Sequence, residues 1–361
     1  MPELDLTLDV VDLAAALCDV PSVSGDEARL ADLLEGALRV LPHVEVMRDG
    51  DAVLARTNLG RPSRVVVAGH LDTVPIAGNL PTWREGTGDD EVLWGRGTVD
   101  MKSGVAVMAS LAAELTAPRH DVTWVFYDNE EVDAARNGLG RIARHHADWL
   151  AADFAVLAEP SNGSVEGGCN GTLRVEVRTS GTAAHSARAW MGFNAIHAAT
   201  EILARLEAYV PATHEVDGLA YRESLNAVLI SGGVATNVIP DACTVTVNYR
   251  FAPSTTLAQA EAHVREVFAG FDVELTDAAG GARPGLDHPA AAEFVAAVLA
   301  ATGREPAPKY GWTDVARFAE LGVPAVNFGP GDPSLAHHDA ERCPVRQIRE
   351  SRASLRAWLA P

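Results

Sequence analysis

The chain has 361 residues, of which 47% are hydrophobic and 22% are charged, and its formal net charge is −20 at pH 7. This length favours two domains over one simple core, and the composition is ordinary for a globular protein. The negative charge argues against nucleic acid or an anionic membrane as a partner, because phosphate groups bind to basic surfaces. No apolar stretch reaches the roughly 20 residues that a membrane-spanning helix needs.

The first part of the chain predicts helices that alternate with strands. The expected helices are 10–18, 26–41, 105–115 and 139–148, with Asp26 as the N-cap of the second. The expected strands are 44–48, 52–57, 64–70, 122–127 and 154–158. The last three are continuous apolar runs, as buried parallel strands are. This alternation predicts an α/β fold with a mostly parallel sheet covered by helices.

The pattern changes at about residue 172. Residues 173–179 alternate apolar and polar side chains with a period of two, which is typical of a half-exposed antiparallel strand. The elements that follow complete a β-α-β-β-α-β order, the ferredoxin-like arrangement. They are strands at 225–231, 243–251 and 271–276 and helices at 194–209 and 257–268. After residue 284 the α/β pattern returns, with a helix at 289–301 and a strand at 323–328.

We therefore predict a discontinuous catalytic domain that carries an inserted domain. The catalytic domain comprises residues 1–171 and 285–361, and the α+β insert comprises residues 172–284. A domain inserted between consecutive elements of one sheet leaves those elements adjacent in space. Candidate residues on either side of the insert can therefore meet at one site.

The cysteines and the first twenty residues predict a cytoplasmic protein. Cys18, Cys169, Cys243 and Cys343 form no CxxC pair, so a zinc knuckle or a thioredoxin-like motif is disfavoured. Scattered cysteines in a large chain are typical of a reducing compartment. Residues 1–20 are acidic and lack the basic start of a signal peptide.

Four of the apolar runs end in side chains that can bind a metal ion. Binding sites of open α/β sheets lie beyond the carboxyl ends of the strands, so these side chains should converge on one edge of the sheet. Imidazole together with carboxylate suits zinc, manganese or cobalt. The candidates are His70, Asp72, Glu130, Glu131, Glu159 and either His337 or His338.

Each candidate also has a plain structural interpretation. Asp72 could orient the His70 imidazole through its second ring nitrogen, or the pair could lie in a surface turn. Asp100 precedes a predicted helix and could cap it or bridge two metal ions. Glu130 and Glu131 could divide metal binding and proton transfer between them, or belong to a solvated acidic loop. The number of these residues, and their order at the strand ends, favour the metal site.

Four segments resemble the signature blocks of the M20 family of di-zinc amidohydrolases. They are 69–75, 95–104, 129–131 and 158–160, and their order and spacing make the resemblance specific over essentially the whole chain. The resemblance implies a two-domain hydrolase whose inserted domain forms a homodimer. It also implies two divalent metal ions per chain, zinc first, with cobalt or manganese as alternatives.

Carried over by position, the resemblance implies five metal ligands. They are His70 and Glu159 on one ion, Glu131 and His337 on the other, and Asp100 as the bridge between them. His337 is preferred to His338 because Glu341 follows it by four positions, which is the family spacing.

The resemblance also implies residues for catalysis and for substrate binding. Asp72 would orient the first imidazole, Glu130 would be the general base, and His185 would reach into the active site of the partner subunit. The implied substrate contacts are Asn237, Thr313 and Arg250, with Arg250 pairing with a carboxylate of the substrate. Arg317, one predicted helical turn after Thr313, is a second candidate for a carboxylate.

Within the family the chain looks most like the succinyl-diaminopimelate desuccinylases. This implies metal-dependent hydrolysis of N-succinyl-LL-2,6-diaminopimelate to succinate and LL-diaminopimelate, a step of lysine and cell-wall biosynthesis. An acetylornithine deacetylase, an aminoacylase or a dipeptidase would use the same chemistry, and residues 168–171 and 311–314 depart from the usual desuccinylase pattern.

Other classes of function fit the chain less well. An inactive binding protein of the same family would have lost a metal ligand or the base, and all are present. A dinucleotide-dependent enzyme would carry GxGxxG between its first strand and helix, and a serine hydrolase would carry a GxSxG elbow. The chain has neither pattern.

Overall fold

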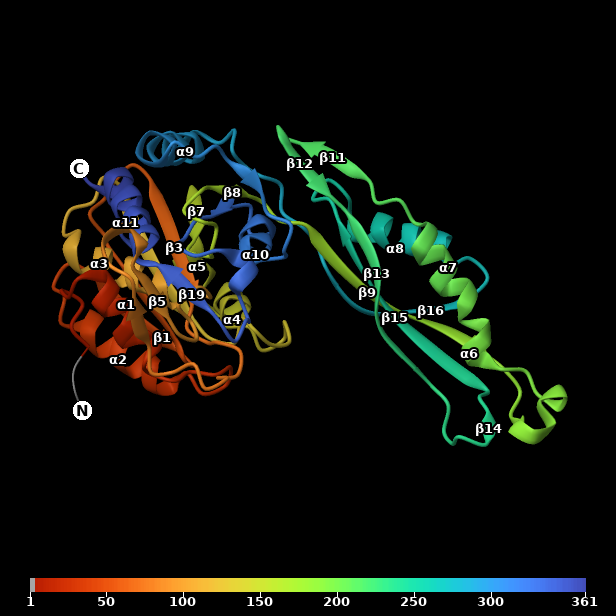
Figure 1. The fold of residues 1–361 in the computed structure, drawn as a ribbon. Helices are drawn as coiled ribbons and strands as arrows, with labels where there is room; N and C mark the ends of the chain where they lie inside the picture. The colour runs from red at the N-terminus through yellow and green to blue at the C-terminus, as the bar shows by residue number, and fades with distance from the viewer. Residues whose placement is uncertain (1–3) are drawn as a thin grey trace. The chain divides into compact units, whose positions relative to one another are not determined.

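The computed structural model describes residues 4–361, which form two compact units (Figure 1). The first unit contains the chain up to Gly167 together with Pro284–Ala307 and Arg317–Pro361, and the second contains Gly168–Arg283 and Pro308–Ala316. The sequence placed these boundaries after residues 171 and 284 and did not separate 308–316. Among residues 4–361, no helix is both long and apolar enough to cross a membrane.

An eight-stranded sheet forms the centre of the first unit, in the order β1-β2-β6-β3-β7-β18-β8-β17. Its strands are β1 (Glu45–Asp49), β2 (Ala52–Arg56), β3 (Arg64–His70), β6 (Asp121–Tyr127), β7 (Phe154–Leu157), β8 (Glu166–Gly167), β17 (Ala307–Pro308) and β18 (Ala325–Asn327). The four central strands, β6, β3, β7 and β18, are parallel, and β1, β2 and β8 pair antiparallel at the flanks. Every residue of β6 and β7 is buried, which explains their continuous apolar sequences.

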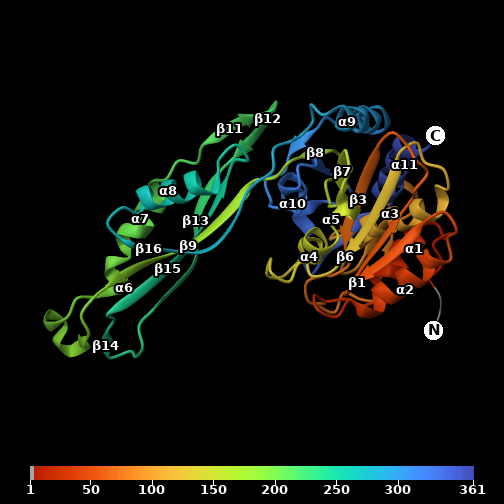
Figure 2. The ribbon, with the colours of Figure 1, turned by 180° about the vertical axis from the view of Figure 1, so that it is seen from behind.

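Helices cover both faces of this sheet (Figures 1 and 2). Five helices share a continuous hydrophobic core with one face: α1 (Val10–Cys18), α2 (Ala28–Arg39), α3 (Lys102–Glu114), α9 (Pro289–Thr302) and α11 (Val345–Leu359). On the opposite face lie α4 (Gly138–His145), α5 (Ala147–Leu150) and α10 (Val315–Glu320). These layers confirm the predicted α/β class.

A second, small sheet joins two distant parts of the first unit. It consists of β4 (Trp83–Glu85), β5 (Val92–Trp94) and β19 (Arg342–Pro344), all antiparallel. β5 leads toward Asp100, and β19 comes shortly after His337. The sheet therefore brings these two candidate residues into one region although the second unit separates them in sequence.

The second unit is built on a four-stranded antiparallel sheet in the order β13-β15-β9-β16. Its strands are β9 (Gly171–Ser180), β13 (Ser224–Gly232), β15 (Ala242–Phe251) and β16 (Asp272–Ala279). One face of the sheet packs against α6 (Ala195–Ala198), α7 (Thr200–Ala208) and α8 (Leu257–Val267). The chain order is β-α-β-β-α-β, which confirms the ferredoxin-like arrangement.

Local details differ from the predictions. Asp26 is not the N-cap of α2; that position belongs to Glu27, which makes no side-chain cap bond there. The helix predicted at 139–148 is two helices separated at His146, whose backbone is not helical (φ −140°, ψ 44°). The sequence did not predict the hairpin of β11 (Thr213–Val216) and β12 (Leu219–Arg222) or the pair of β10 (Ala184–His185) and β14 (Val238–Ile239).

Candidate metal centre

The carboxyl ends of the four parallel strands meet at one edge of the sheet. His70, the last residue of β3, pairs in register with Tyr127, the last residue of β6. On the other side of β3, Leu157 of β7 pairs with Ala68, and Asn327 of β18 pairs with Leu157. The residues that follow these ends therefore lie at the same edge, where open α/β sheets carry their binding sites.

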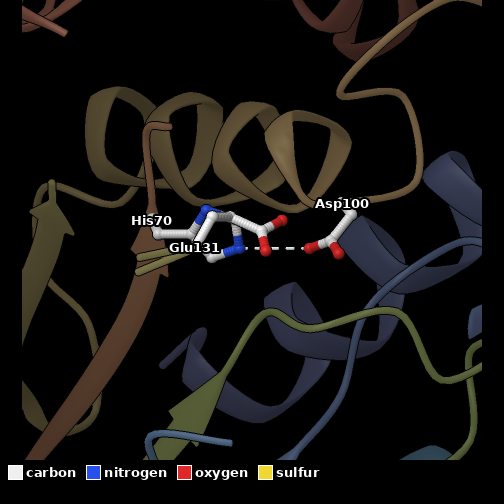
Figure 3. A group of neighbouring side chains, drawn as sticks. All are labelled: His70, Asp100 and Glu131. Atoms are coloured by element: carbon white, nitrogen blue, oxygen red, sulfur yellow. Dashed lines mark hydrogen bonds and ion pairs between the residues drawn. The ribbon is translucent and has the colours of Figure 1, made fainter. Parts of the chain in front are cut away.

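Three of the predicted ligands form a group at this edge (Figure 3). His70, Asp100 and Glu131 each offer one ligand atom, and these atoms all lie within 4.8 Å of one another. The Nε2 atom of His70 lies 3.1 Å from Oδ1 of Asp100. One imidazole and two carboxylates make a donor set that fits zinc, manganese or cobalt.

His337 joins this group from beyond β18. Its Nε2 atom lies 3.0 and 2.9 Å from the two carboxylate oxygens of Glu131 and 3.4 Å from Oδ2 of Asp100. His338 makes local contacts instead: its Nδ1 atom accepts a hydrogen bond from the backbone N–H of Ala340. The geometry thus favours His337, as the spacing to Glu341 did.

The carboxylates of the group favour positive charge at its centre. The hydrogen bond to Asp100, together with Glu131, raises the pKa of His337 to about 10. Burial acts to lower the pKa of His70, but hydrogen bonds to Asp100 and Asp72 outweigh it and raise the pKa well above its usual value. Burial acts to raise the pKa of Asp100, but its hydrogen bonds to both imidazoles lower it. A site that stabilises protonated imidazoles in this way also attracts a metal cation.

Asp72 organises the residues around the group, and its side chain is fully buried. The Nδ1 atom of His70 lies 3.0 Å from the backbone carbonyl oxygen of Asp72 and 3.4 Å from its Oδ1. A carbonyl oxygen only accepts, so Nδ1 carries a proton, and Nε2 is the nitrogen that would bind a metal ion once it has lost its own proton. The carboxylate of Asp72 accepts the backbone N–H groups of Glu130 and Glu131, each at 3.0 Å, and the hydroxyl of Ser24 at 2.8 Å.

These donors set the charge state of Asp72. Burial acts to raise the pKa of its carboxyl group, but the hydrogen bonds from His70 and from the backbone of Glu130 and Glu131 lower it. The sequence suggested that Asp72 orients His70. It did not reveal Ser24, which lies 48 positions away in the chain.

Glu341 holds the backbone of Asp100 in place. The sequence indicated this residue only by its position, four residues after His337. The carboxylate of Glu341 is fully buried and accepts the backbone N–H groups of Val99 and Asp100, at 2.9 and 3.1 Å. Its other oxygen accepts a hydrogen bond from Arg96 at 2.7 Å. Since Arg96 also donates to the carbonyl oxygen of His338, this ion pair joins the segment of Asp100 to the segment of His337.

Glu159 is 6% exposed and follows β7 after Ala158. The first turn of α3 approaches this segment closely, because a Cβ atom on Gly104 would lie 2.2 Å from the carbonyl oxygen of Ala158. Glycine at position 104 therefore lets the helix that follows Asp100 pack against the strand end that carries Glu159.

The second unit brings together two other predicted site residues. His185 in β10 pairs in register with Val238 in β14, and the backbone N–H of Ser186 donates to the carbonyl oxygen of Asn237 at 2.9 Å. His185 is exposed, so its imidazole is accessible. Asn237 and His185 are thus neighbours, although 52 positions separate them in the chain.

The candidates for substrate carboxylates lie in different settings. The Nε atom of Arg250, in β15, donates to the side-chain oxygen of Asn248 at 3.1 Å. Burial lowers the pKa of Arg250, and no carboxylate of residues 4–361 lies within ion-pair distance of it. Thr313 is buried in the second unit, whereas Arg317 lies in α10 in the first.

Comparisons with known proteins identify the family and its relatives. The family model of peptidase family M20/M25/M40 matches residues 66–360. The chain is 56% identical over 359 residues to a putative succinyl-diaminopimelate desuccinylase, DapE, of Mycobacterium tuberculosis, with 99% of each chain covered. It is 48% identical over 370 residues to the succinyl-diaminopimelate desuccinylase of Corynebacterium glutamicum, covering 99% of this chain and 98% of the relative.

Solved structures share the fold at lower identity. A tripeptidase from Staphylococcus aureus has a TM-score of 0.80 at 19% identity, covering 99% of this chain and 98% of the other. The aminopeptidase PepT from Bacillus cereus has a TM-score of 0.77 at 20% identity, with 97% of each chain covered.

Proposed function

The chain belongs to peptidase family M20/M25/M40, and from this membership we propose that it hydrolyses N-succinyl-LL-2,6-diaminopimelate to succinate and LL-diaminopimelate. The observation that carries the proposal is identity of 56% and 48% over nearly the full chain to relatives named as desuccinylases. The grouping of His70, Asp100 and Glu131 at one sheet edge supports the chemistry that such a reaction needs.

The reaction adds water across an amide bond. In this proposal two divalent metal ions would be held, one by His70 and Glu159 and the other by Glu131 and His337, with Asp100 contributing to both. When bound, they would polarise the amide carbonyl and lower the pKa of a water molecule. We propose zinc as the native metal, with cobalt or manganese as alternatives, because each accepts imidazole and carboxylate ligands.

Glu130 is the general base of this proposal. The backbone N–H groups of Glu130 and Glu131 both donate to the carboxylate of Asp72, so one side chain positions both residues. Glu130 takes a proton from the attacking water and returns it to the leaving amine, which departs as the amino group of diaminopimelate. Asp72 keeps the proton of His70 on Nδ1, so that Nε2 stays a ligand.

The second unit supplies a homodimer interface in this proposal. Its edge strand β13 exposes Val228, Leu229 and Ile230, and Trp190 is 81% exposed beside His185 in the chain. An exposed apolar strand edge is a surface that proteins normally cover by pairing. His185 acts in the active site of the partner subunit, as a hydrogen-bond donor to the oxyanion.

Substrate recognition rests on cations in a strongly acidic protein. The substrate carries carboxylates at both ends, and Arg250 has no carboxylate partner within the described chain. We assign it to one substrate carboxylate, with Arg317 as the second candidate and Asn237 and Thr313 as polar contacts. The free, buried cysteines agree with a cytoplasmic enzyme.

A comparison of three substrates tests the proposal. Purified, metal-loaded protein should turn over N-succinyl-diaminopimelate much faster than N-acetylornithine or a dipeptide. Equal or faster turnover of N-acetylornithine would instead identify a deacetylase, the second candidate that the same chemistry allows. Metal analysis of the fully active protein should find two equivalents per chain, and fewer than one would exclude the two-metal form.

A further inference from the structure

The loop between β6 and α4 carries both Glu130 and Glu131. It begins at Asp128, directly after β6, and ends at Asn137, whose side chain accepts the N–H of Gly140 and caps α4. Two carboxylates that divide metal binding and proton transfer must each stand within a fraction of an ångström of their working position. What fixes this loop is therefore part of how the site works.

The two ends of the loop are tied together at Asp128. The N–H of Gly138 donates to the carbonyl oxygen of Asp128 at 2.8 Å. A Cβ atom at position 138 would lie 2.4 Å from Oδ1 of Asp128, so only glycine allows this approach. The guanidinium of Arg141, one turn into α4, donates to both carboxylate oxygens of Asp128, at 2.6 and 3.1 Å.

The same guanidinium reaches a third segment. Its Nε atom donates to Oδ1 of Asp49 at 2.7 Å, and an NH2 hydrogen goes to the carbonyl oxygen of Asp49 at 2.8 Å. Asp49 is the last residue of β1. Arg141 therefore joins the start of α4, the end of β6 and the end of β1, at a site where all three side chains are mostly buried.

Asn129 lies between Asp128 and the two glutamates, and its backbone conformation is constrained. Asn129 has a left-handed backbone (φ 57°), which residues other than glycine adopt rarely. Its side-chain amide donates to Oδ2 of Asp128 at 2.7 Å, and its backbone N–H donates to the buried Glu27 at 3.1 Å. The left-handed turn then directs the N–H groups of Glu130 and Glu131 to Asp72.

We propose that Arg141 is a positioning residue for Glu130 and Glu131: its bidentate hold on Asp128 sets the left-handed turn that places the two carboxylates. The inference rests on the roles given to these glutamates in the proposed function. Exposed ion pairs contribute little, but a guanidinium that makes four hydrogen bonds to two segments also fixes geometry. Lysine carries the same charge and lacks the planar fork, so it cannot replace arginine here.

The chain offers a matched control on the same helix. Arg144 lies one turn after Arg141, is exposed, and takes part in no ion pair within residues 4–361. Arg141→Met should lower kcat by about 10- to 100-fold and leave KM within about threefold, because a misplaced base slows the reaction more than it weakens binding. Arg141→Lys should lower kcat almost as much, and Arg144→Met should change neither constant by more than about twofold.

A second measurement needs neither substrate nor metal. In the metal-free protein, hydrogen exchange of a peptide that spans residues 128–133 should be faster in Arg141→Met and Arg141→Lys than in the wild type and in Arg144→Met. Exchange in β3 and β7 should be unchanged, which separates a local loss of order from unfolding. Asp49→Asn weakens the contact of Arg141 with β1, leaves its hydrogen bond to the carbonyl oxygen of Asp49, and also removes the ion pairs of Asp49 with His145 and His146, so it should give a smaller change in the same direction.

The outcomes separate this inference from the proposed function. Failure of the wild type to hydrolyse the succinyl substrate would refute the proposed activity, and the exchange experiment would still test Arg141. Unchanged exchange in residues 128–133 of Arg141→Lys, or equal effects of the Arg141 and Arg144 substitutions, would overturn the positioning role. If Arg141→Met does not fold, Arg141→Lys and Asp49→Asn decide.

Discussion

At the scale of single residues, two left-handed positions that are not glycine lie at the candidate metal centre. Asn129 has φ 57° and His337 has φ 63°. Such conformations cost free energy and persist where surrounding contacts compensate for them, which occurs often at functional sites. Here the compensation is visible: Asn129 is held by Asp128 and Glu27, and the His337 imidazole is held by Glu131 and Asp100.

Replacement of Glu130 by glutamine tests its proposed role as the general base. The amide keeps the size of the side chain and the backbone hydrogen bond to Asp72 but cannot take a proton. We expect kcat to fall by about 10²–10⁴-fold, while the metal content and the melting temperature stay those of the wild type. A variant that retained more than about a tenth of the wild-type kcat would place the proton transfer on another residue.

His337 should make the metal-free protein sensitive to pH. Its pKa in the folded state is raised from 6.5 to about 10, chiefly by Asp100. A raised pKa stabilises the fold fully below about pH 6.5, and this contribution disappears as the pH rises through about 10. The side chain is about half exposed, so the effect is modest.

Melting temperatures of the metal-free protein measure this effect. Wild type should be more stable than His337→Gln at pH 6, and the difference should shrink steadily up to pH 10, because glutamine does not titrate. A difference that stays constant over this range would show that His337 is not protonated in the metal-free site. Metal binding should tighten over the same range, since the ligand form of the imidazole is the neutral one.

At the scale of helices and strands, the position of Glu159 depends on how closely α3 approaches β7. Gly104→Ala would place a Cβ atom 2.2 Å from the carbonyl oxygen of Ala158, so the helix and the strand end must separate. We expect a loss of about 1–3 kcal/mol in the free energy of unfolding, together with weaker metal binding. Urea denaturation and metal titration measure the two effects.

Gly36 in α2 is the matched control for this substitution. A Cβ atom at position 36 would meet nothing within 4 Å, so Gly36→Ala should stabilise the protein by about 0.5–1 kcal/mol through helix propensity alone. If both substitutions gave the same sign, close packing at Gly104 would not be the reason for glycine there.

The elements that the sequence predicted are those with a long local pattern. The helix at 10–18 has the predicted bounds, and the buried strands β3, β6 and β7 were visible as continuous apolar runs. The three-residue strands β4 and β5 are too short to show a period, and the break at His146 interrupts no hydrophobic pattern. Chain segments far apart in sequence also supply contacts that no local pattern encodes: Ser24 on Asp72, Glu341 on Asp100 and Arg141 on Asp49.

At the scale of the whole molecule, the charge and the proposed substrate oppose each other. A protein with a net charge of −20 repels the proposed substrate at long range, because its three carboxylates outnumber its one ammonium group. Recognition therefore depends on a few local cations, and Arg250 is the strongest candidate because it is mostly buried without an ion-pair partner among residues 4–361. Raising the ionic strength should screen the repulsion and accelerate substrate capture until the local pairing is itself weakened.

The proposed dimer makes a sharper prediction, because each active site would need both chains. Glu130→Gln and His185→Ala should each abolish activity in their own homodimers. In a mixed dimer, one site carries both substitutions and the other carries neither, since Glu130 comes from one chain and His185 from its partner. In an equal mixture with full subunit exchange, about half of the dimers should be mixed, so about a quarter of the wild-type activity should return.

Activity assays before and after exchange, with native mass spectrometry to confirm mixed dimers, measure this recovery. If mixed dimers form and remain inactive, His185 does not act across the interface; a monomeric chain would remove the shared site altogether.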